Sequence, residues 1–139
     1  MVSDIVSKYE LIAKSNELDL KFASNAEKPY VYADIALINR VMQNLIDNAI
    51  KHTPSGGQII VNIDHVQDQL MVSVKDTGVG IADGELPFIF DRYKKGNTES
   101  GTGLGLAIVK KILELHESKI NVVSVLKQGT SFTFSLPIR

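Results

Sequence analysis

The sequence predicts an α+β fold, a two-layer sandwich in which helices cover one face of a mixed, mostly antiparallel sheet. Two neighbouring segments, residues 59–63 and 70–74, have the hydrophobic period of two that is typical of half-buried antiparallel strands. Other segments have helical spacing, and the order is helix, strands, helix, strands, loop, helix, strands. A chain of 139 residues has the usual size of one domain, so we expect a single domain over residues 1–139.

The composition argues against several classes of protein. Apolar residues make up 44% and charged residues 22%, which is typical of a globular chain. The formal net charge of −1 provides no basic field that would attract nucleic acid or anionic lipid. The absence of cysteine rules out disulfides and thiolate metal sites. No apolar run approaches the roughly 20 residues of a membrane span, and residues 1–4 do not begin a signal peptide.

The N-terminal third is expected to contain a helix and two short strands. Residues 3–16 have an apolar helical face made of Ile5, Val6, Tyr9, Ile12 and Ala13. Residues 19–23 form the first predicted strand, in which the apolar Leu18, Leu20 and Phe22 alternate with Asp19, Lys21 and Ala23. A second short strand is predicted at residues 30–32, and Asp34 is the expected N-cap of the next helix.

The remaining elements surround an irregular glycine-rich stretch. The middle helix, which ends before residues 54–57, carries an apolar stripe of Ile35, Ile38, Met42, Leu45, Ile46 and Ala49. Residues 76–105 lack regular periodicity, and only residues 86–93 are apolar enough to dock on the core. The last helix is predicted to direct inward Leu104, Ile108, Ile112 and Leu115. Strands at residues 120–126 and 131–136 follow, joined by a turn at Gly129.

The middle helix also has a polar stripe that could carry chemistry. Asn44, Asn48 and Lys51 are spaced by four and three residues, so they project from nearly the same side, next to Asp47 and His52. An amide oxygen is a neutral ligand for Mg²⁺, and a lysine one turn further on could neutralise phosphate. A solvated helix face is the alternative interpretation of this stripe.

Two glycine-rich segments could bind a nucleotide. Residues 76–80 (DTGVG) follow a strand, where a carboxylate can accept a hydrogen bond from a ligand while the backbone approaches closely. Residues 101–106 (GTGLGL) open a helix, where free N–H groups can bind anions. Each segment alone could also be an ordinary turn. Neither the dinucleotide-binding spacing GxGxxG nor a P-loop is present, since Thr102 stands where a P-loop has lysine.

Together and in this order, the segments resemble the motifs of sensor histidine kinases. Residues 44–49 (NLIDNA) resemble the N box, residues 76–81 (DTGVGI) the first glycine box, and residues 88–93 (FIFDRY) the F box. Residues 101–106 are similar to the second glycine box, and residues 129–137 to the usual end of the domain. The resemblance covers essentially the whole chain. It implies the Bergerat ATP-binding fold of the GHKL superfamily, with ATP and Mg²⁺ as ligands.

The resemblance also implies roles for individual residues. Asn48 would coordinate Mg²⁺, while Asn44 and Lys51 would face the phosphates. Asp76 would hydrogen-bond the adenine amine, and Thr130 would help to line the adenine pocket. The glycine boxes would supply the other contacts with the nucleotide, from Gly78, Gly80, Ile81, Gly101, Thr102, Gly103, Leu104, Gly105 and Leu106. Of these, residues 101–105 would form the hinge and the phosphate-contacting end of a mobile lid.

Three features of the sequence depart from the family pattern. His52 stands where the family often has a tyrosine near adenine, and imidazole offers less stacking surface. Lys95 occupies the place of the arginine that ends the F box, so its contact with the γ-phosphate would lack a bidentate fork. Glu117 and Ser118 replace a glycine pair, which is expected to weaken the C-cap of the last helix.

The same residues favour phosphoryl transfer over hydrolysis. In the related gyrase-type ATPases, a glutamate one turn before the metal asparagine activates water, and here that position is Asn44. Asp47 should point about a quarter-turn away. Catalysis would then rest on positioning and charge neutralisation by Asn44, Asn48, Lys51 and Lys95.

The phosphoacceptor histidine is expected to lie outside this chain. His65 is predicted in a turn and His52 lies in the N box. The sequence around His116 lacks the proline of the family's acceptor motif and ends a helix. Residues 1–16 are interpreted as the joint to an upstream dimerisation domain. The other implied partner is a response regulator, and the implied location is the cytoplasmic side of a membrane, with any anchor elsewhere in the protein.

Two other classes of protein remain open at this point. An anti-sigma-factor kinase shares the fold and phosphorylates serine on a partner, although the F box and residues 101–106 favour the sensor kinase. A non-catalytic module that holds nucleotide as a switch is the second alternative.

Overall fold

The computed structural model describes residues 2–24, 35–90 and 105–137. In chain order, the elements are α1 (Val2–Ser15), β1 (Asp19–Ser24), α2 (Ile35–His52), β2 (Gln58–Val66), β3 (Gln69–Asp76), the short 3₁₀ helix η1 (Leu86–Phe88), α3 (Gly105–Leu115), β4 (Asn121–Val125) and β5 (Gly129–Pro137). The strand predicted at residues 30–32 and the N-cap predicted at Asp34 lie outside the described residues.

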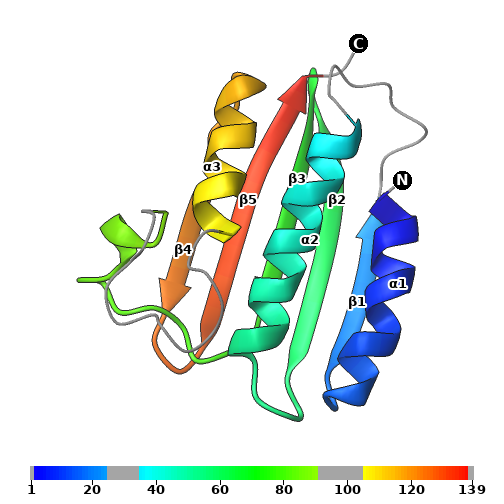
Figure 1. Ribbon diagram of the computed structural model, residues 1–139, viewed down its shortest axis with the longest axis vertical. Coiled ribbons are helices and arrows are strands. Elements are labelled where there is room, and N and C mark those ends of the chain that lie inside the picture. The colour runs from blue at the N-terminus through cyan, green and yellow to red at the C-terminus, as the bar shows by residue number, and fades with distance from the viewer. Residues whose placement is uncertain (1, 25–34, 91–104, 138–139) are drawn as a thin grey trace.

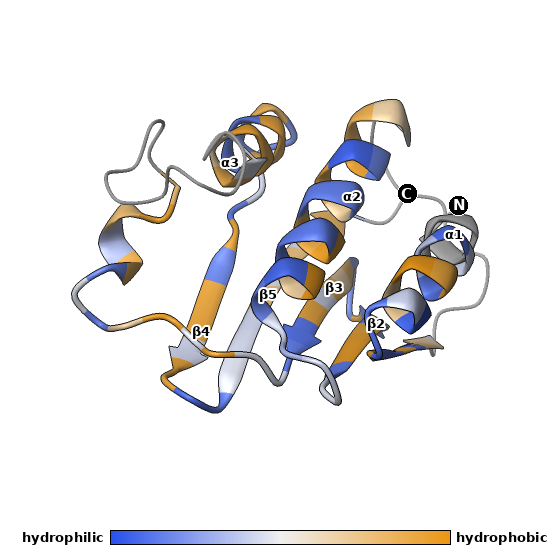
Figure 2. Ribbon diagram, turned by 60° about the horizontal axis from the view of Figure 1, so that its bottom comes forward, coloured by the Kyte–Doolittle hydropathy of each residue, from blue (hydrophilic) through white to orange (hydrophobic). Residues whose placement is uncertain are grey.

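The five strands form one sheet in the order β1-β2-β3-β5-β4. β1 pairs with β2 in parallel, and every other pairing is antiparallel. The three α-helices of the described chain lie side by side on the same face of this sheet (Figures 1 and 2). The predicted α+β class and the mostly antiparallel sheet are therefore confirmed. No helix within the three described stretches is long and apolar enough to span a membrane.

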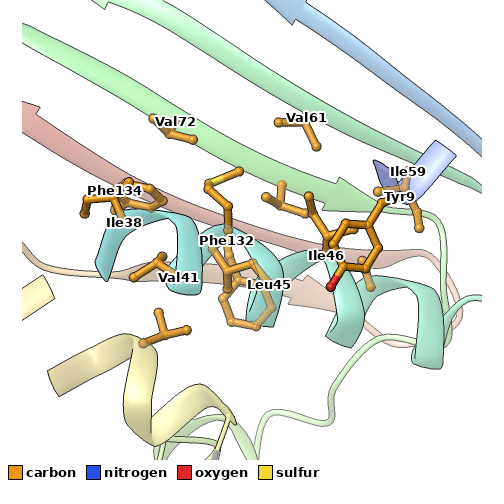
Figure 3. Packing of buried hydrophobic residues seen from close by; sticks show 14 of the residues in the cluster. Tyr9, Ile38, Val41, Leu45, Ile46, Ile59, Val61, Val72, Phe132 and Phe134 are labelled. Atoms are coloured by element: carbon orange, nitrogen blue, oxygen red, sulfur yellow. The ribbon is translucent and has the colours of Figure 1, made fainter. Parts of the chain in front are cut away.

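The core lies between α2 and the centre of the sheet (Figure 3). The predicted stripe of α2 is buried wherever its side chains are described, at Ile38, Met42, Leu45, Ile46 and Ala49. Val41 is also fully buried, which widens the apolar face beyond the stripe. The reason is that α2 is the central helix and packs against α1 and α3 as well as against the sheet.

Three apolar residues of the predicted faces are exposed because they lie at the margins of the helical layer, and the prediction that Leu115 points inward is wrong. Leu115 ends α3 and is 65% exposed, since α3 instead buries Val109, Ile112 and Leu113. Ile12 of α1 is 40% exposed and Phe22 of β1 is 37% exposed. In the described part of the sheet, β1 is an edge strand with β2 as its neighbour, so the helices cover it less completely than the central strands. Periodicity identifies an apolar face but not where the covering layer ends.

The connection between β2 and β3 is shorter than the sequence indicated. His65 lies within β2 and not in a turn, and it is exposed. One of its ring nitrogens, Nε2, lies 3.0 Å from the carbonyl oxygen of Gln67. Gln67 itself has a φ of 55°, so the chain reverses tightly at this residue.

The segment that follows β3 runs past the β4–β5 turn to the outer side of β4 and α3 (Figures 1 and 2). Its apolar part docks on the core, as predicted for this segment. Ile89 is buried, and the ring of Phe90 meets that of Phe132 edge to face, with centroids 6.2 Å apart. Phe88 points outward and is 53% exposed.

Helices α1 and α3 end in the same backbone motif although neither has a glycine at the stop. The N–H of Leu18 donates to the carbonyl of Ala13 at 2.9 Å, and that of Ser118 donates to Leu113 at 2.8 Å. The preceding residues, Glu17 and Glu117, have φ of 60° and 57°. This is the left-handed C-cap that glycine adopts most readily, so the glutamates carry strain.

We therefore expect Glu117→Gly to raise the free energy of unfolding by about 1 kcal/mol, since the left-handed conformation costs a non-glycine residue roughly that amount. Glu17→Gly should have a similar effect because its geometry is the same. Urea unfolding followed by circular dichroism would measure both. Glu114→Gly, inside α3, is the matched control and should destabilise the protein. A destabilised Glu117→Gly variant would contradict the prediction.

Candidate functional site

The centre of the site is Asp76, the last residue of β3. Its side chain is only 4% exposed. The oxygen Oδ1 accepts two backbone hydrogen bonds, from the N–H of Gly78 at 2.8 Å and from that of Thr130 at 3.2 Å. Within the described part of the chain, no group donates a hydrogen bond to the other oxygen, Oδ2. The carboxylate is thus held rigidly by one oxygen, while the second can accept a hydrogen bond from a ligand.

Burial perturbs the ionisation of this site. Desolvation raises the pKa of Asp76, while the hydrogen bonds from Gly78 and Thr130 and the nearby His52 lower it in part. Desolvation and then the charge of Lys51 lower the pKa of His52, opposed by Asp76. The lowered pKa favours the neutral form of His52 at pH 7. The end of α2 lies beside the loop that follows β3, because the carbonyl oxygen of His52 accepts a hydrogen bond from the N–H of Val79 at 3.1 Å.

Gly78 lets the first glycine box pack directly on the end of α2. A Cβ atom at Gly78 would lie 2.3 Å from the backbone oxygen of His52. That same oxygen accepts a hydrogen bond from the N–H of Val79 at 3.1 Å. No side chain larger than hydrogen fits between these backbones, so a glycine at this position is a packing requirement.

Gly80 makes the matching approach to the other side of the site. It has a φ of 76°, and a Cβ there would lie 2.3 Å from the carbonyl oxygen of Val125. The N–H of Lys127 donates to the carbonyl of Val79 at 2.7 Å. The loop after β3 is thereby fixed between the end of α2 and the β4–β5 turn.

One residue of the polar stripe of α2, Asn44, lies beside the start of α3. Asn44 and Asn48 are half-buried and Lys51 is exposed. A Cβ at Gly105, the first residue of α3, would lie 3.9 Å from the side-chain amide of Asn44. The Nδ2 of Asn44 is buried and, among the described residues, has no hydrogen-bond partner. An unpaired amide beside a helix N-terminus fits a phosphate group, because both present N–H groups to an anion.

Asp47 belongs to a different contact. It accepts a hydrogen bond from the hydroxyl of Tyr9 in α1. Burial first, and then this bond and the charge of Asp47, raise the pKa of Tyr9 to about 12. The side chain thus ties α2 to α1, in agreement with the quarter-turn offset expected from the sequence.

The structure brings most of the predicted residues to one end of the sheet. Thr130 is buried directly opposite Asp76 in the register of β5 and β3. Ile81 and Leu106 are half-buried beside the core. The remaining predicted positions, Lys95, Gly101, Thr102, Gly103 and Leu104, lie outside the described residues.

Ser124, a polar residue at the same end of the sheet as Asp76, was not predicted from the sequence. Ser124 of β4 accepts a hydrogen bond from the backbone N–H of Ile81 at 2.7 Å, and its hydroxyl lies 2.8 Å from that of Thr130. A signal was available, because Ser124 has the same strand parity as the inward Val122 and is polar.

The described residues do not form a complete metal site by themselves. No group of three or more histidine, aspartate or glutamate side chains in that part of the chain could hold a metal ion. The predicted metal ligand is instead the side-chain amide oxygen of Asn48. An amide oxygen suits Mg²⁺ when phosphate oxygens and waters complete the coordination.

Comparisons with known proteins agree with this geometry. The family described as histidine kinase-, DNA gyrase B-, and HSP90-like ATPase matches residues 33–139. The adaptive-response sensory kinase SasA of Rippkaea orientalis is 42% identical over 142 residues, which cover 99% of this chain and 36% of SasA. The chain thus spans roughly a third of the length of the curated relatives that it matches.

Solved structures of histidine kinases match the fold. The nucleotide-free catalytic domain of ThkA has a TM-score of 0.88 and 31% identity, covering 98% of this chain and 89% of that domain. Full-length ShkA in complex with AMPPNP has a TM-score of 0.88 and 25% identity, covering 99% and 29%. ThkA in complex with the response regulator protein TrrA has a TM-score of 0.83 and 28% identity, covering 99% and 39%.

Fold and site together define an ATP-binding domain of the Bergerat type. The family match covers residues 33–139, and the relatives match nearly the full chain. Both findings assign the chain to the same family. The chain belongs to the family of histidine kinase-, DNA gyrase B- and HSP90-like ATPases, and its relatives in that family are sensor histidine kinases.

Proposed function

We propose that this chain binds Mg-ATP and transfers the γ-phosphate to a histidine on a separate dimerisation domain, as the catalytic domain of a two-component sensor kinase. The observation that carries the proposal is the Asp76 carboxylate, which is buried, anchored through Oδ1 and close to the end of α2, the helix that also carries Asn44 and Asn48. We infer that this acceptor for a purine amine and the amides for the phosphate end form one nucleotide site.

In this proposal, each residue has one task toward the nucleotide. Asp76 accepts a hydrogen bond from the adenine amine, and Asn48 holds Mg²⁺ through its amide oxygen. Asn44 and Lys51 face the phosphates, together with the N–H groups at the start of α3 and, from the undescribed segment, Lys95. Bound Mg²⁺ would neutralise charge on the phosphate oxygens.

The acidic and amide groups of α2 support transfer in preference to hydrolysis. Asn44 has no proton-accepting carboxylate, and Asp47 is engaged by the hydroxyl of Tyr9. A histidine nitrogen supplied by another domain would form the N–P bond as the bond between the γ-phosphorus and the β,γ-bridging oxygen breaks, and ADP would leave. The chain's own His116 follows the end of α3, and the sequence after it lacks the proline of the family's acceptor motif, so we assign the acceptor histidine to another domain.

The partners follow from the same proposal. Residues 1–16, which include most of α1, would join the chain to the upstream dimerisation domain. A response regulator would receive the phosphate, which is supported by the complex of ThkA with TrrA. We place the domain on the cytoplasmic side of the membrane, with any anchor in another part of the protein.

Phosphotransfer tests the proposal directly. The chain would be mixed with a histidine-containing dimerisation domain of a sensor kinase and γ-labelled ATP, and the acid and base stability of the product measured. Acid-labile, base-stable phosphate is the expected result. Acid-stable phosphoserine on a supplied partner protein would instead identify an anti-sigma-type kinase, and binding without transfer a nucleotide switch.

Asn48→Ala tests the metal role separately. We expect the affinity for ATP to fall roughly tenfold with Mg²⁺ present, about 1.4 kcal/mol, and to change little in EDTA. Calorimetric titration with and without Mg²⁺ would measure both values. Gln43→Ala, on another side of α2, is the control and should behave like the wild type. Equal losses with and without Mg²⁺ would contradict metal coordination by Asn48.

A further inference from the structure

A short chain of hydrogen bonds connects three strands at the end of the sheet where Asp76 lies. Ser124, Thr130 and Asp76 are neighbours across β4, β5 and β3 in the strand register. The Oγ of Ser124 lies 2.8 Å from Oγ1 of Thr130 and 3.1 Å from the carbonyl oxygen of Gly129. The backbone N–H of Thr130 donates to Oδ1 of Asp76. Ser124 is therefore linked to the carboxylate through a single residue.

Ser124 also holds the first glycine box. The N–H of Ile81 donates to its Oγ at 2.7 Å, across 43 positions in the sequence. The backbone of Gly80, the residue before Ile81, lies so close to Val125, the residue after Ser124, that a Cβ atom at Gly80 would be 2.3 Å from the carbonyl oxygen of Val125. One hydroxyl thus fixes both the loop that follows Asp76 and the strand that carries Thr130.

The proton count on these hydroxyls determines what Thr130 can offer a ligand. A serine hydroxyl has one proton and two lone pairs. Every contact is satisfied when Ser124 donates to Gly129, accepts from Ile81 and accepts the hydroxyl proton of Thr130. The hydroxyl of Thr130 then donates its hydrogen bond to Ser124. Its oxygen can therefore act toward a ligand only as an acceptor, beside the carboxylate of Asp76.

We propose that Ser124 is a positioning residue for purine recognition, which orients the hydroxyl of Thr130 as an acceptor and fixes the backbone of Ile81 next to Asp76. This inference rests on the proposed nucleotide site. Two neighbouring acceptors, Asp76 and Thr130, favour a purine with an amine at carbon 6 over one with a carbonyl there. Without Ser124, the hydroxyl of Thr130 would be free to rotate and donate to that carbonyl.

The test compares ADP with IDP, which has a carbonyl in place of the adenine amine, on the full chain by calorimetric titration. Ser124→Ala is expected to weaken ADP binding about tenfold, since it leaves several polar groups without partners. It should also reduce the preference for ADP over IDP at least about threefold, because donation to the carbonyl becomes possible. Ser124→Thr keeps the hydroxyl and should restore both values.

Ser131→Ala is the matched control, because Ser131 is adjacent to Thr130 but on the opposite face of β5. Its ADP affinity and its ratio of ADP to IDP affinity should equal those of the wild type. A loss of stability in Ser124→Ala with an unchanged ratio would mean a structural role only and would overturn the inference. If the wild type itself fails to bind ADP, the proposed function fails first, and this inference fails with it.

Discussion

Asp76→Asn is expected to weaken ATP binding about a hundredfold, or ~2.7 kcal/mol, without loosening the site. Asparagine can still accept the backbone hydrogen bonds of Gly78 and Thr130 through Oδ1. Its NH₂ group then replaces Oδ2, so a donor faces the purine amine where an acceptor stood. Two hydrogen-bond donors that face each other in a buried site are both left without partners, which lowers the affinity for the ligand strongly.

The same substitution should stabilise the nucleotide-free protein at neutral pH. Burial raises the pKa of Asp76, so the folded state binds its proton more tightly than the unfolded state. The stability that this group contributes is complete below the unfolded pKa of about 3.9 and is lost as pH rises through the higher folded pKa. Asparagine does not ionise, and the variant avoids that loss.

Two measurements check these expectations. Calorimetry should show that wild-type ATP affinity falls as pH drops through the raised pKa of Asp76, a dependence that the variant lacks. Urea unfolding at pH 7.5 should show the variant to be the more stable protein. Asp83→Asn, at an exposed loop position, is the control for both. Unaltered ATP affinity in Asp76→Asn would remove the basis of the proposed adenine contact.

Gly78→Ala is expected to destabilise the fold by about 2 kcal/mol or more and to abolish measurable nucleotide binding. The added methyl group would overlap the backbone oxygen of His52 and approach Oδ1 of Asp76, at 2.3 and 2.9 Å. The first neighbour is a backbone atom and the second is held by two hydrogen bonds, so the loop must move away from α2. That movement breaks the hydrogen bond of Val79 to His52 and disturbs the one that Gly78 donates to Asp76.

The matched control is Gly84→Ala, in the same loop. A Cβ at Gly84 meets nothing within 4 Å, and Gly84 is not among the described glycines with positive φ. Thermal unfolding and ADP titration of the two variants should therefore differ clearly. If Gly78→Ala unfolds like Gly84→Ala, the close contact between the glycine box and α2 is not required for stability.

The regular elements were predictable from the sequence because their periods are local. The stripe of α2 and the alternation in β2 and β3 repeat over a few residues, and the structure buries those side chains as expected. The order of Asn44, Asn48, Asp76 and Thr130 along the chain likewise predicted a family, which the comparisons support.

Positions that depend on neighbouring layers were not predictable in this way. Leu115 fits the helical period of α3 but lies at the end of that helix, where its side chain is largely exposed. Ser124 is an ordinary polar strand residue until β4 pairs with β5 and the loop after β3 reaches it. The strain at Glu17 and Glu117 also appears only once the helix ends are formed.

The sequence by itself therefore determined the helices and strands, the class of fold and the residue types that a nucleotide site needs. The tertiary structure decided which oxygen of Asp76 is left to accept, which asparagine faces the start of α3, and that Asp47 turns toward Tyr9. The physical reason is the distance along the chain over which the deciding interactions act. Secondary structure follows from interactions within a few residues, whereas hydrogen-bond partners and burial are set by segments distant along the chain.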